Sequence, residues 1–230
     1  MLYALGRRGA EVLDVPVRKG VGERYVAHQL MIGNVRIALT LASRERGIVC
    51  VWRSFPGGDA FPIRPDGFFS FQFPELPEGR NRAFFFLEAD RSTMPRERFV
   101  EKLRRYEAWH AGGAHTAVLG IRSFRVLTVT KSPERLASLL AAVAAEARIE
   151  RRRGYWFTGE ADLLGGMAGR VFERVWQQPG SPGPRESLLP GCFGSAALTT
   201  CWRRSSHCAP YAGRSPDQPQ TSTEEPKEGG

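Results

Sequence analysis

Residues 83–90 read AFFFLEAD, and this stretch decides the fold. A continuous apolar run of this kind is typical of a strand that is covered on both faces of its sheet. It ends at Glu88 and Asp90, which are two residues apart and therefore lie on the same face of a strand. A second aromatic run, FFSFQF at 68–73, precedes it, and the proline and glycine between the two runs predict a hairpin.

The remaining patterns predict helices and strands around this hairpin. In chain order, we expect a helix at 22–43, strands at 48–52, 68–73 and 83–90, a helix capped by Ser92 or Thr93 and ending at Gly112, a strand at 124–129, a helix opened by Ser132 and running to 147, and a strand at 155–157. The order helix-strand-strand-strand-helix-strand-helix-strand predicts an α/β fold with a mixed sheet flanked by helices. In this fold an antiparallel meander is followed by a strand-helix-strand crossover.

Composition separates a basic folded part from a different C-terminal stretch. The chain has 33 Lys and Arg against 24 Asp and Glu, a net charge of +9, which favours a polyanionic partner such as nucleic acid. Residues 178–230 hold 8 of the 16 prolines, and five basic residues there balance five acidic ones, so the net charge belongs to residues 1–177. We expect a domain at 21–177 and a disordered low-complexity tail at 178–230.

The sequence gives no indication of a membrane protein. It contains no apolar stretch approaching the roughly 18 to 20 residues that a membrane span requires. Its four cysteines are unevenly placed and do not form a disulfide framework. We therefore expect a cytoplasmic protein that has no membrane partner.

Three carboxylates are expected at one end of the predicted sheet. The hairpin brings Asp66, at the start of one strand, back to the end where Glu88 and Asp90 close the next. Such a cluster needs a divalent cation or basic side chains to neutralise it, and oxygen ligands suit Mg²⁺ or Mn²⁺. A metal held there could activate water against a phosphodiester. The alternative is a set of strand-end acids paired with neighbouring arginines, namely Arg64, Arg82 or Arg91.

The residues in this order resemble known families. The Pro-Asp pair at 65–66 followed by Glu-Ala-Asp at 88–90 resembles the core of the PD-(D/E)XK nuclease superfamily. More closely, residues 1–153 are similar to the replication-relaxation family of bacterial plasmid and mobile-element proteins. The matching stretches are HQL at 28–30, NVR at 34–36, RPDGFF at 64–69, FFLEADRST at 85–93 and KLRRY at 102–106. This resemblance implies a restriction-endonuclease-like core and, at residues 1–20, the remnant of a winged-helix wing followed by a linker.

The chain departs from the nuclease pattern at one position. The resemblance implies a lysine two residues after Glu88, where this chain has Asp90. Lys102 on the following helix could supply the missing cation, and Arg98 lies four residues before it on the same helical face. His28, on the first helix, is expected near the same sheet end as a proton shuttle or ligand. Lys102 has a plainer interpretation as a solvated helix residue, and His28 as a polar boundary residue.

Further arginines are candidate nucleic-acid contacts. Arg148, Arg151, Arg152 and Arg153 follow the alanine-rich helix predicted to begin at Ser132. Their density suits phosphate contacts, although arginines also complement the C-terminus of a helix. Together with Arg98 they form the predicted set of nucleic-acid contacts.

The sequence therefore predicts a DNA-associated protein of the replication-relaxation type that acts in plasmid or mobile-element replication. DNA is the expected partner, and other replication proteins are a second class of partner. Two alternatives remain open. One is an active Mg²⁺-dependent endonuclease in which Asp66, Glu88 and Asp90 hold the metal and Lys102 replaces the missing lysine. The other is a non-catalytic protein-interaction domain.

Overall fold

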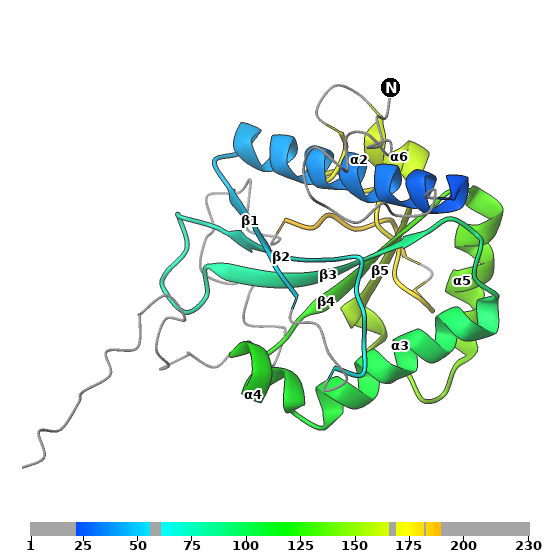
Figure 1. The fold of residues 1–230 in the computed structure, drawn as a ribbon. Coiled ribbons are helices and arrows are strands. Elements are labelled where there is room, and N and C mark those ends of the chain that lie inside the picture. The colour runs from blue at the N-terminus through cyan, green and yellow to red at the C-terminus, as the bar shows by residue number, and fades with distance from the viewer. Residues whose placement is uncertain (1–21, 56–60, 166–168, 182, 190–230) are drawn as a thin grey trace, which may run out of the picture.

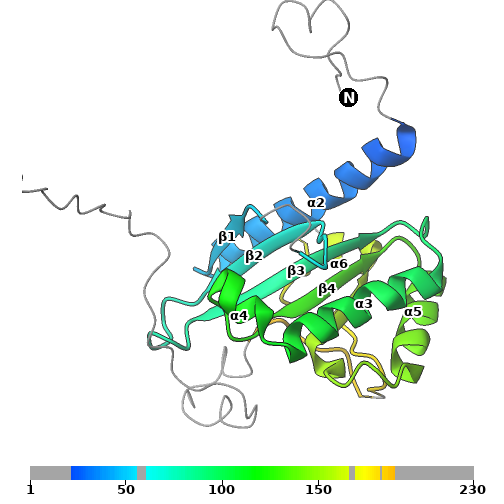
Figure 2. The same ribbon diagram turned by 60° about the horizontal axis from the view of Figure 1, so that its bottom comes forward.

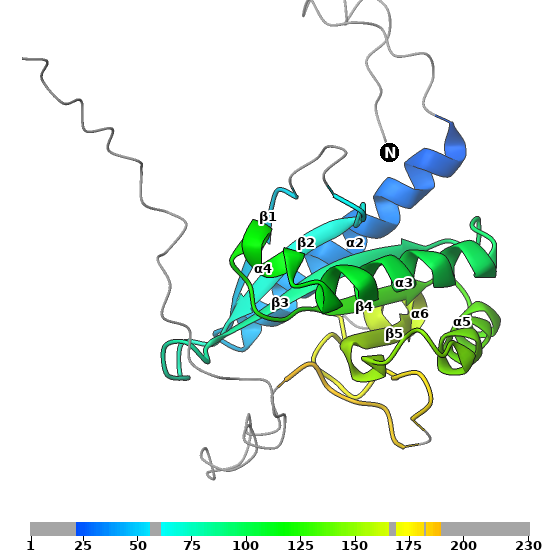
Figure 3. The ribbon, with the colours of Figure 1, turned by 90° about the horizontal axis from the view of Figure 1, so that it is seen from below.

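The computed structural model describes residues 22–55, 61–165, 169–181 and 183–189, which form a sheet covered by helices on both faces (Figure 1). Helices α2 and α6 lie on one face, and α3, α4 and α5 lie on the other (Figures 2 and 3). The elements are α2 (Glu23–Glu45), β1 (Val49–Arg53), β2 (Gly67–Gln72), β3 (Arg82–Asp90), α3 (Arg96–Ala111), α4 (Ala114–Leu119), β4 (Arg125–Thr130), α5 (Pro133–Ala145), the 3-10 turn η1 (Arg152–Gly154), β5 (Tyr155–Gly159) and α6 (Glu160–Leu164).

The sheet has five strands in the order β1-β2-β3-β4-β5. Strands β1, β2 and β3 pair antiparallel, whereas β3, β4 and β5 run parallel to one another. The predicted mixed sheet flanked by helices is therefore confirmed. Its topology places the start of β2 and the C-terminal ends of β3, β4 and β5 at the same edge of the sheet.

Phenylalanines from β2 and β3 fill both sides of the sheet. Phe69 and Phe85 are register partners and stack at 5.3 Å between ring centroids on the α2 side. Phe68 and Phe86 stack at 4.9 Å on the α3 side. Aromatic cross-strand pairs stabilise a sheet, and they explain why an uninterrupted aromatic run forms a strand here. Glu88 and Asp90 share the face of Phe86, as the two-residue period predicts.

Some details differ from the prediction. The structure contains α4 and α6, two short helices that the predicted order omits. The predicted cap of α3 by Ser92 or Thr93 is wrong, because Pro95 occupies the N-cap position. Ser92 instead adopts a left-handed turn with φ 61°. The predicted cap of α5 is confirmed, since the Ser132 hydroxyl accepts a hydrogen bond from the Arg135 backbone N–H at 3.3 Å.

The packed part of the chain continues past residue 177. Trp176 and Glu186 exchange backbone hydrogen bonds, and Leu188 is 1% exposed in the core beneath α2. The composition of residues 178–189 suggests a tail, but Pro179 and Leu188 in this stretch are buried, while most of the described residues between them are exposed. The predictions for residues 1–20 and for the rest of the tail lie outside the described residues. None of the described helices is both long enough and apolar enough to cross a bilayer.

Candidate active site

The three predicted carboxylates lie at the sheet edge formed by the start of β2 and the end of β3. The Asp66 backbone N–H donates to the Leu87 carbonyl at 2.9 Å, which continues the antiparallel ladder by one residue. The Ala89 N–H in turn donates to Asp66 Oδ2 at 2.8 Å. The hairpin therefore brings Asp66 next to the strand that carries Glu88 and Asp90. We call these three side chains the carboxylate cluster.

Glu88 is the buried member of the cluster, with 2% of its surface exposed. The Tyr106 hydroxyl donates to Glu88 Oε1 at 2.6 Å, and the Lys102 ammonium donates to Oε2. Burial raises the pKa of Glu88 from 4.5 to about 7, and the nearby Asp66 adds to this, while Lys102 opposes it. Burial, with Glu88 as neighbour, also raises the pKa of Tyr106 well above 10. Glu88 is therefore a carboxyl group that can change its protonation state near neutral pH.

Asp66 is held by the first helix of the described chain. Its Oδ1 lies 3.0 Å from His28 Nε2, and this contact is an ion pair whenever the imidazole is protonated. The His28 and Asp66 side chains are 31% and 20% exposed, so solvent reaches both. The structure thus brings His28 to the cluster, at the position where the sequence predicts it.

Asp90 has a partner that sequence reasoning missed. Arg135, at the start of α5, donates from Nε to Asp90 Oδ2 at 2.8 Å and from Nη2 to Oδ1 at 3.0 Å. Arg135 Nη2 also donates to the Met94 carbonyl at 2.7 Å. The Asp90 and Arg135 side chains are only 3% and 13% exposed. This two-point contact fixes Asp90 in place, and it involves none of the three arginines that the sequence offered as partners.

In this arrangement, protein groups occupy the oxygens that a Mg²⁺ or Mn²⁺ ion would need. Each oxygen of the three carboxylates already contacts a protein group: His28 and the Ala89 N–H for Asp66, Tyr106 and Lys102 for Glu88, and Arg135 for Asp90. Within the described ranges, no three His, Cys, Asp or Glu side chains are grouped so that they could ligate one metal ion. Basic side chains, which were the predicted alternative to a metal, contact all three carboxylates here: His28, Lys102 and Arg135.

The predicted arginine contacts divide into two groups. Arg98, Arg148, Arg152 and Arg153 are exposed. Arg151 turns inward: its Nη2 donates to the Phe124 carbonyl at 2.7 Å, and its guanidinium lies 5.0 Å from the centroid of the Phe124 ring. Burial lowers the pKa of Arg151. Arg151 is therefore occupied by the fold, and the other four are free to face a partner.

Two residues of the site carried signals in the sequence. Tyr106 lies four residues after Lys102, so a helix places both side chains on one face. Arg135 follows the cap of α5, and a crossover between parallel strands brings that helix start to the carboxyl end of β3. The position of Arg135 can be inferred from the sequence only if β3 and β4 are known to be adjacent and parallel.

A comparison with protein families identifies the chain. The family model described as Replication-relaxation matches residues 1–123 of the 230. The chain belongs to the replication-relaxation family. The match includes Asp66, Glu88, Asp90 and Lys102, whereas Arg135 lies beyond it. No match is found among curated proteins or among solved structures.

Unpaired basic residues surround the cluster of this replication-relaxation chain. Arg24 precedes His28 by one helical turn, and Arg98 precedes Lys102 by one turn. Arg64 lies two residues before Asp66, and Lys131 follows β4, where its backbone N–H donates to the Asp90 carbonyl at 3.1 Å. All four are exposed, and none makes a side-chain ion pair within the part of the chain that the structure describes.

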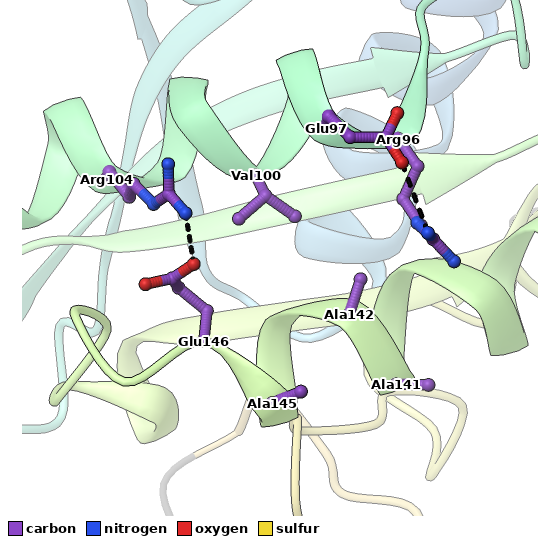
Figure 4. A pocket seen from close by; sticks show the side chains of 8 residues that line it. All are labelled: Arg96, Glu97, Val100, Arg104, Ala141, Ala142, Ala145 and Glu146. Carbon is purple, nitrogen blue, oxygen red and sulfur yellow. Dashed lines mark hydrogen bonds and ion pairs between the residues drawn. The ribbon is translucent and has the colours of Figure 1, made fainter.

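A pocket of about 440 Å³ lies between α3 and α5, apart from the cluster. Its charged residues pair with one another: Arg104 contacts Glu146, and Arg96 Nη2 donates to Glu97 at 3.1 Å (Figure 4). It is lined by Arg96, Glu97, Val100, Arg104, Ala141, Ala142, Ala145 and Glu146. Because none of the predicted site residues lines this pocket, the sheet edge remains the candidate site.

Proposed function

We propose that this replication-relaxation protein associates with DNA and acts in the replication of plasmids or other mobile elements. Family membership supports a function related to replication. The observation that carries the DNA association is a set of exposed cations, without ion-pair partners among the described residues, around carboxylates that already contact His28, Lys102 and Arg135. Arg24, Arg64, Arg98 and Lys131 come from four different segments that meet at one sheet edge.

This arrangement suits a phosphate backbone for an electrostatic reason. Bare carboxylates at the sheet edge would repel phosphates, but Lys102, Arg135 and His28 contact them. The cations that remain can then attract phosphates without competition from inside the site. Contacts of this kind fix the position of the nucleic acid and carry no sequence information themselves.

A salt titration of DNA binding tests this proposal. We expect a duplex of random sequence to bind, with an affinity that falls as salt increases, because phosphate contacts release counterions. Arg64→Ala and Arg98→Ala should each weaken binding and reduce the slope of log K against log salt by about one. Arg80→Ala is the matched control, since Arg80 is equally exposed but lies in the β2–β3 turn at the opposite end of these strands.

Binding that does not respond to salt, or equal losses in all three variants, would contradict the proposed interface. A complete lack of DNA affinity would instead favour the non-catalytic protein-interaction domain.

One observation favours a second candidate, a metal-dependent endonuclease of the PD-(D/E)XK type. Lys102 contacts Glu88 from α3, where a lysine displaced from the usual position of Asp90 is expected to act. Asp66 immediately precedes the adjacent strand β2, near enough to influence the pKa of Glu88. For this candidate the carboxylates must exchange their present partners, since their oxygens are occupied.

Nicking of supercoiled plasmid separates the two candidates. Purified protein is incubated with Mg²⁺ or Mn²⁺ beside Glu88→Gln, Lys102→Ala and the control Arg80→Ala, with DNA binding followed in the same samples. Nicking that is lost in the first two variants and kept in the control would establish the endonuclease. Binding without nicking in all four proteins would leave a DNA-handling scaffold.

A further inference from the structure

The outer face of α2 carries apolar side chains that the described chain does not cover. Leu30, Ile37 and Leu41 are 46%, 58% and 38% exposed, although they belong to a helix whose other side is packed in the core. Val26 precedes them on the same face, so the apolar positions recur at steps of four, seven and four residues. We call this row the α2 seam. Figures 1 and 2 show α2 on the outside of the described molecule.

The α2 seam is symmetric about its own middle. Leu30 and Ile37 are equidistant from the midpoint between residues 33 and 34, and so are Val26 and Leu41. Two copies of such a row, placed antiparallel, bring each apolar residue opposite another apolar residue. Steps of four and seven residues keep all four side chains on one side of the helix.

The residues at the middle and the ends of the seam follow the same symmetry. At the middle is Gly33, where a side chain would have no atom within 4 Å, so a second helix can approach closely. At the ends are Glu23 and Arg44, again equidistant from the midpoint and on the seam side of the helix. Both are exposed, and neither has an ion-pair partner among the residues that the structure describes.

We propose that α2 is the interface of a homodimer, in which the seams of two copies pack antiparallel about a two-fold axis passing between Gly33 and Asn34. An interface around a two-fold axis must be self-complementary, and the seam has this property at every step. The two ends of the helix pair then form Glu23–Arg44 ion pairs between the copies. A parallel pairing would place Glu23 against Glu23 and Arg44 against Arg44, so charge selects the antiparallel arrangement.

The pairing leaves the sheet edge accessible. His28 contacts Asp66, and it lies on the side of α2 that is turned away from the seam. The dimer would therefore present two copies of the candidate site. The inference does not depend on what that site binds.

Sedimentation of the full chain over a range of concentrations tests the dimer. We expect a monomer–dimer equilibrium, and a dissociation constant at least tenfold weaker in Ile37→Glu, which places a carboxylate in the seam. Val118→Glu is the matched control, because Val118 is 49% exposed on α4 and lies off the seam. A chain that is monomeric at every concentration, or equal effects of the two variants, would overturn the proposal.

A charge exchange tests the antiparallel register and the identity of the partner. Glu23→Arg alone and Arg44→Glu alone each create two like-charge contacts in the proposed dimer, so each should weaken it. The double variant restores both contacts with the charges reversed, and its dissociation constant should return to within a few-fold of the unmodified protein. Failure of this rescue would contradict the antiparallel register of the proposed dimer. Circular dichroism checks that every variant keeps its helical content.

Discussion

At the scale of single residues, the burial of Glu88 makes the stability of the fold depend on pH. A carboxyl group whose pKa is higher in the folded state than in the unfolded state stabilises the fold at low pH, and this contribution is lost as pH rises through the folded pKa. For Glu88 the window runs from 4.5 to about 7. The contribution is on the order of 3 kcal/mol, at about 1.4 kcal/mol for each pKa unit.

The variant Glu88→Gln fixes this side chain in a neutral form. We expect the free energy of unfolding of Glu88→Gln to gain on the unmodified protein as pH rises from 5 to 8, because only the unmodified protein must ionise a buried group. Lys102 is 20% exposed and can turn toward solvent in the variant. Urea unfolding of both proteins at pH 5 and pH 8 measures the difference. An unchanged gap between the two pH values would mean that burial does not raise the pKa of Glu88.

Asp90 and Arg135 make a second prediction at this scale. Arg135→Ala leaves a buried carboxylate without its partner, and such losses cost about 3–5 kcal/mol of unfolding free energy. The double variant that also carries Asp90→Ala removes the unpaired charge and should be more stable than Arg135→Ala alone. A urea double-mutant cycle at pH 7 measures this coupling. Simple addition of the two single effects would contradict the pairing.

Sequence reasoning reached part of this site. The two-residue period puts Glu88 and Asp90 on one face, and the hairpin brings Asp66 to them. The prediction from the sequence missed Arg135 because that residue lies 45 positions from Asp90. Only the parallel pairing of β3 and β4 brings the two residues together. A long-range ion pair leaves no local pattern in the chain.

At the scale of elements, aromatic and helical periodicities predicted the long helices and the strands to within a few residues. Helices α4 and α6 were missed because they span only six and five residues, too few for a period to show. The cap of α3 was misassigned because Ser92 donates its N–H to Asp90 Oδ2 at 3.3 Å and sits in a left-handed turn. The backbone conformation of Ser92 therefore follows from its contact with Asp90 and not from capping of α3.

The pairing of β1 with β2 depends on a glycine. A side chain at Gly67 would place its Cβ 2.6 Å from the Trp52 ring, which cannot move easily because it stacks on Phe69 at 4.8 Å and lies under the Arg36 guanidinium. We therefore expect Gly67→Ala to lower the free energy of unfolding by about 1–3 kcal/mol, as overpacking does. Thermal unfolding measures this.

Gly22→Ala is the control for that substitution. A Cβ at Gly22 has no atom within 4 Å, so only a small change is expected there. Equal melting temperatures for the two variants would show that the Trp52 ring has room to move.

At the scale of the whole molecule, the domain ends later than composition suggests. Proline and glycine content predicts a tail from residue 178. Composition alone cannot show that a leucine within this polar stretch is buried in the core. Leu188 is buried beneath α2, and the Trp176–Glu186 backbone pairing holds the segment in place. Leu188 belongs to the same buried cluster as Phe71 and Phe172, whose ring centroids lie 5.1 Å apart.

A chain that stops at residue 177 should therefore be less stable than one that stops at residue 189. Burial of a leucine side chain contributes about 1.5–3 kcal/mol, and the shorter chain also loses the backbone pairing of Trp176. Urea unfolding of the two chains measures the difference. Leu188→Ala in the longer chain separates the two causes, since it removes the side chain and keeps the pairing. If all three proteins unfold at the same urea concentration, residues 178–189 do not contribute to the fold, and the boundary predicted from composition is the correct one.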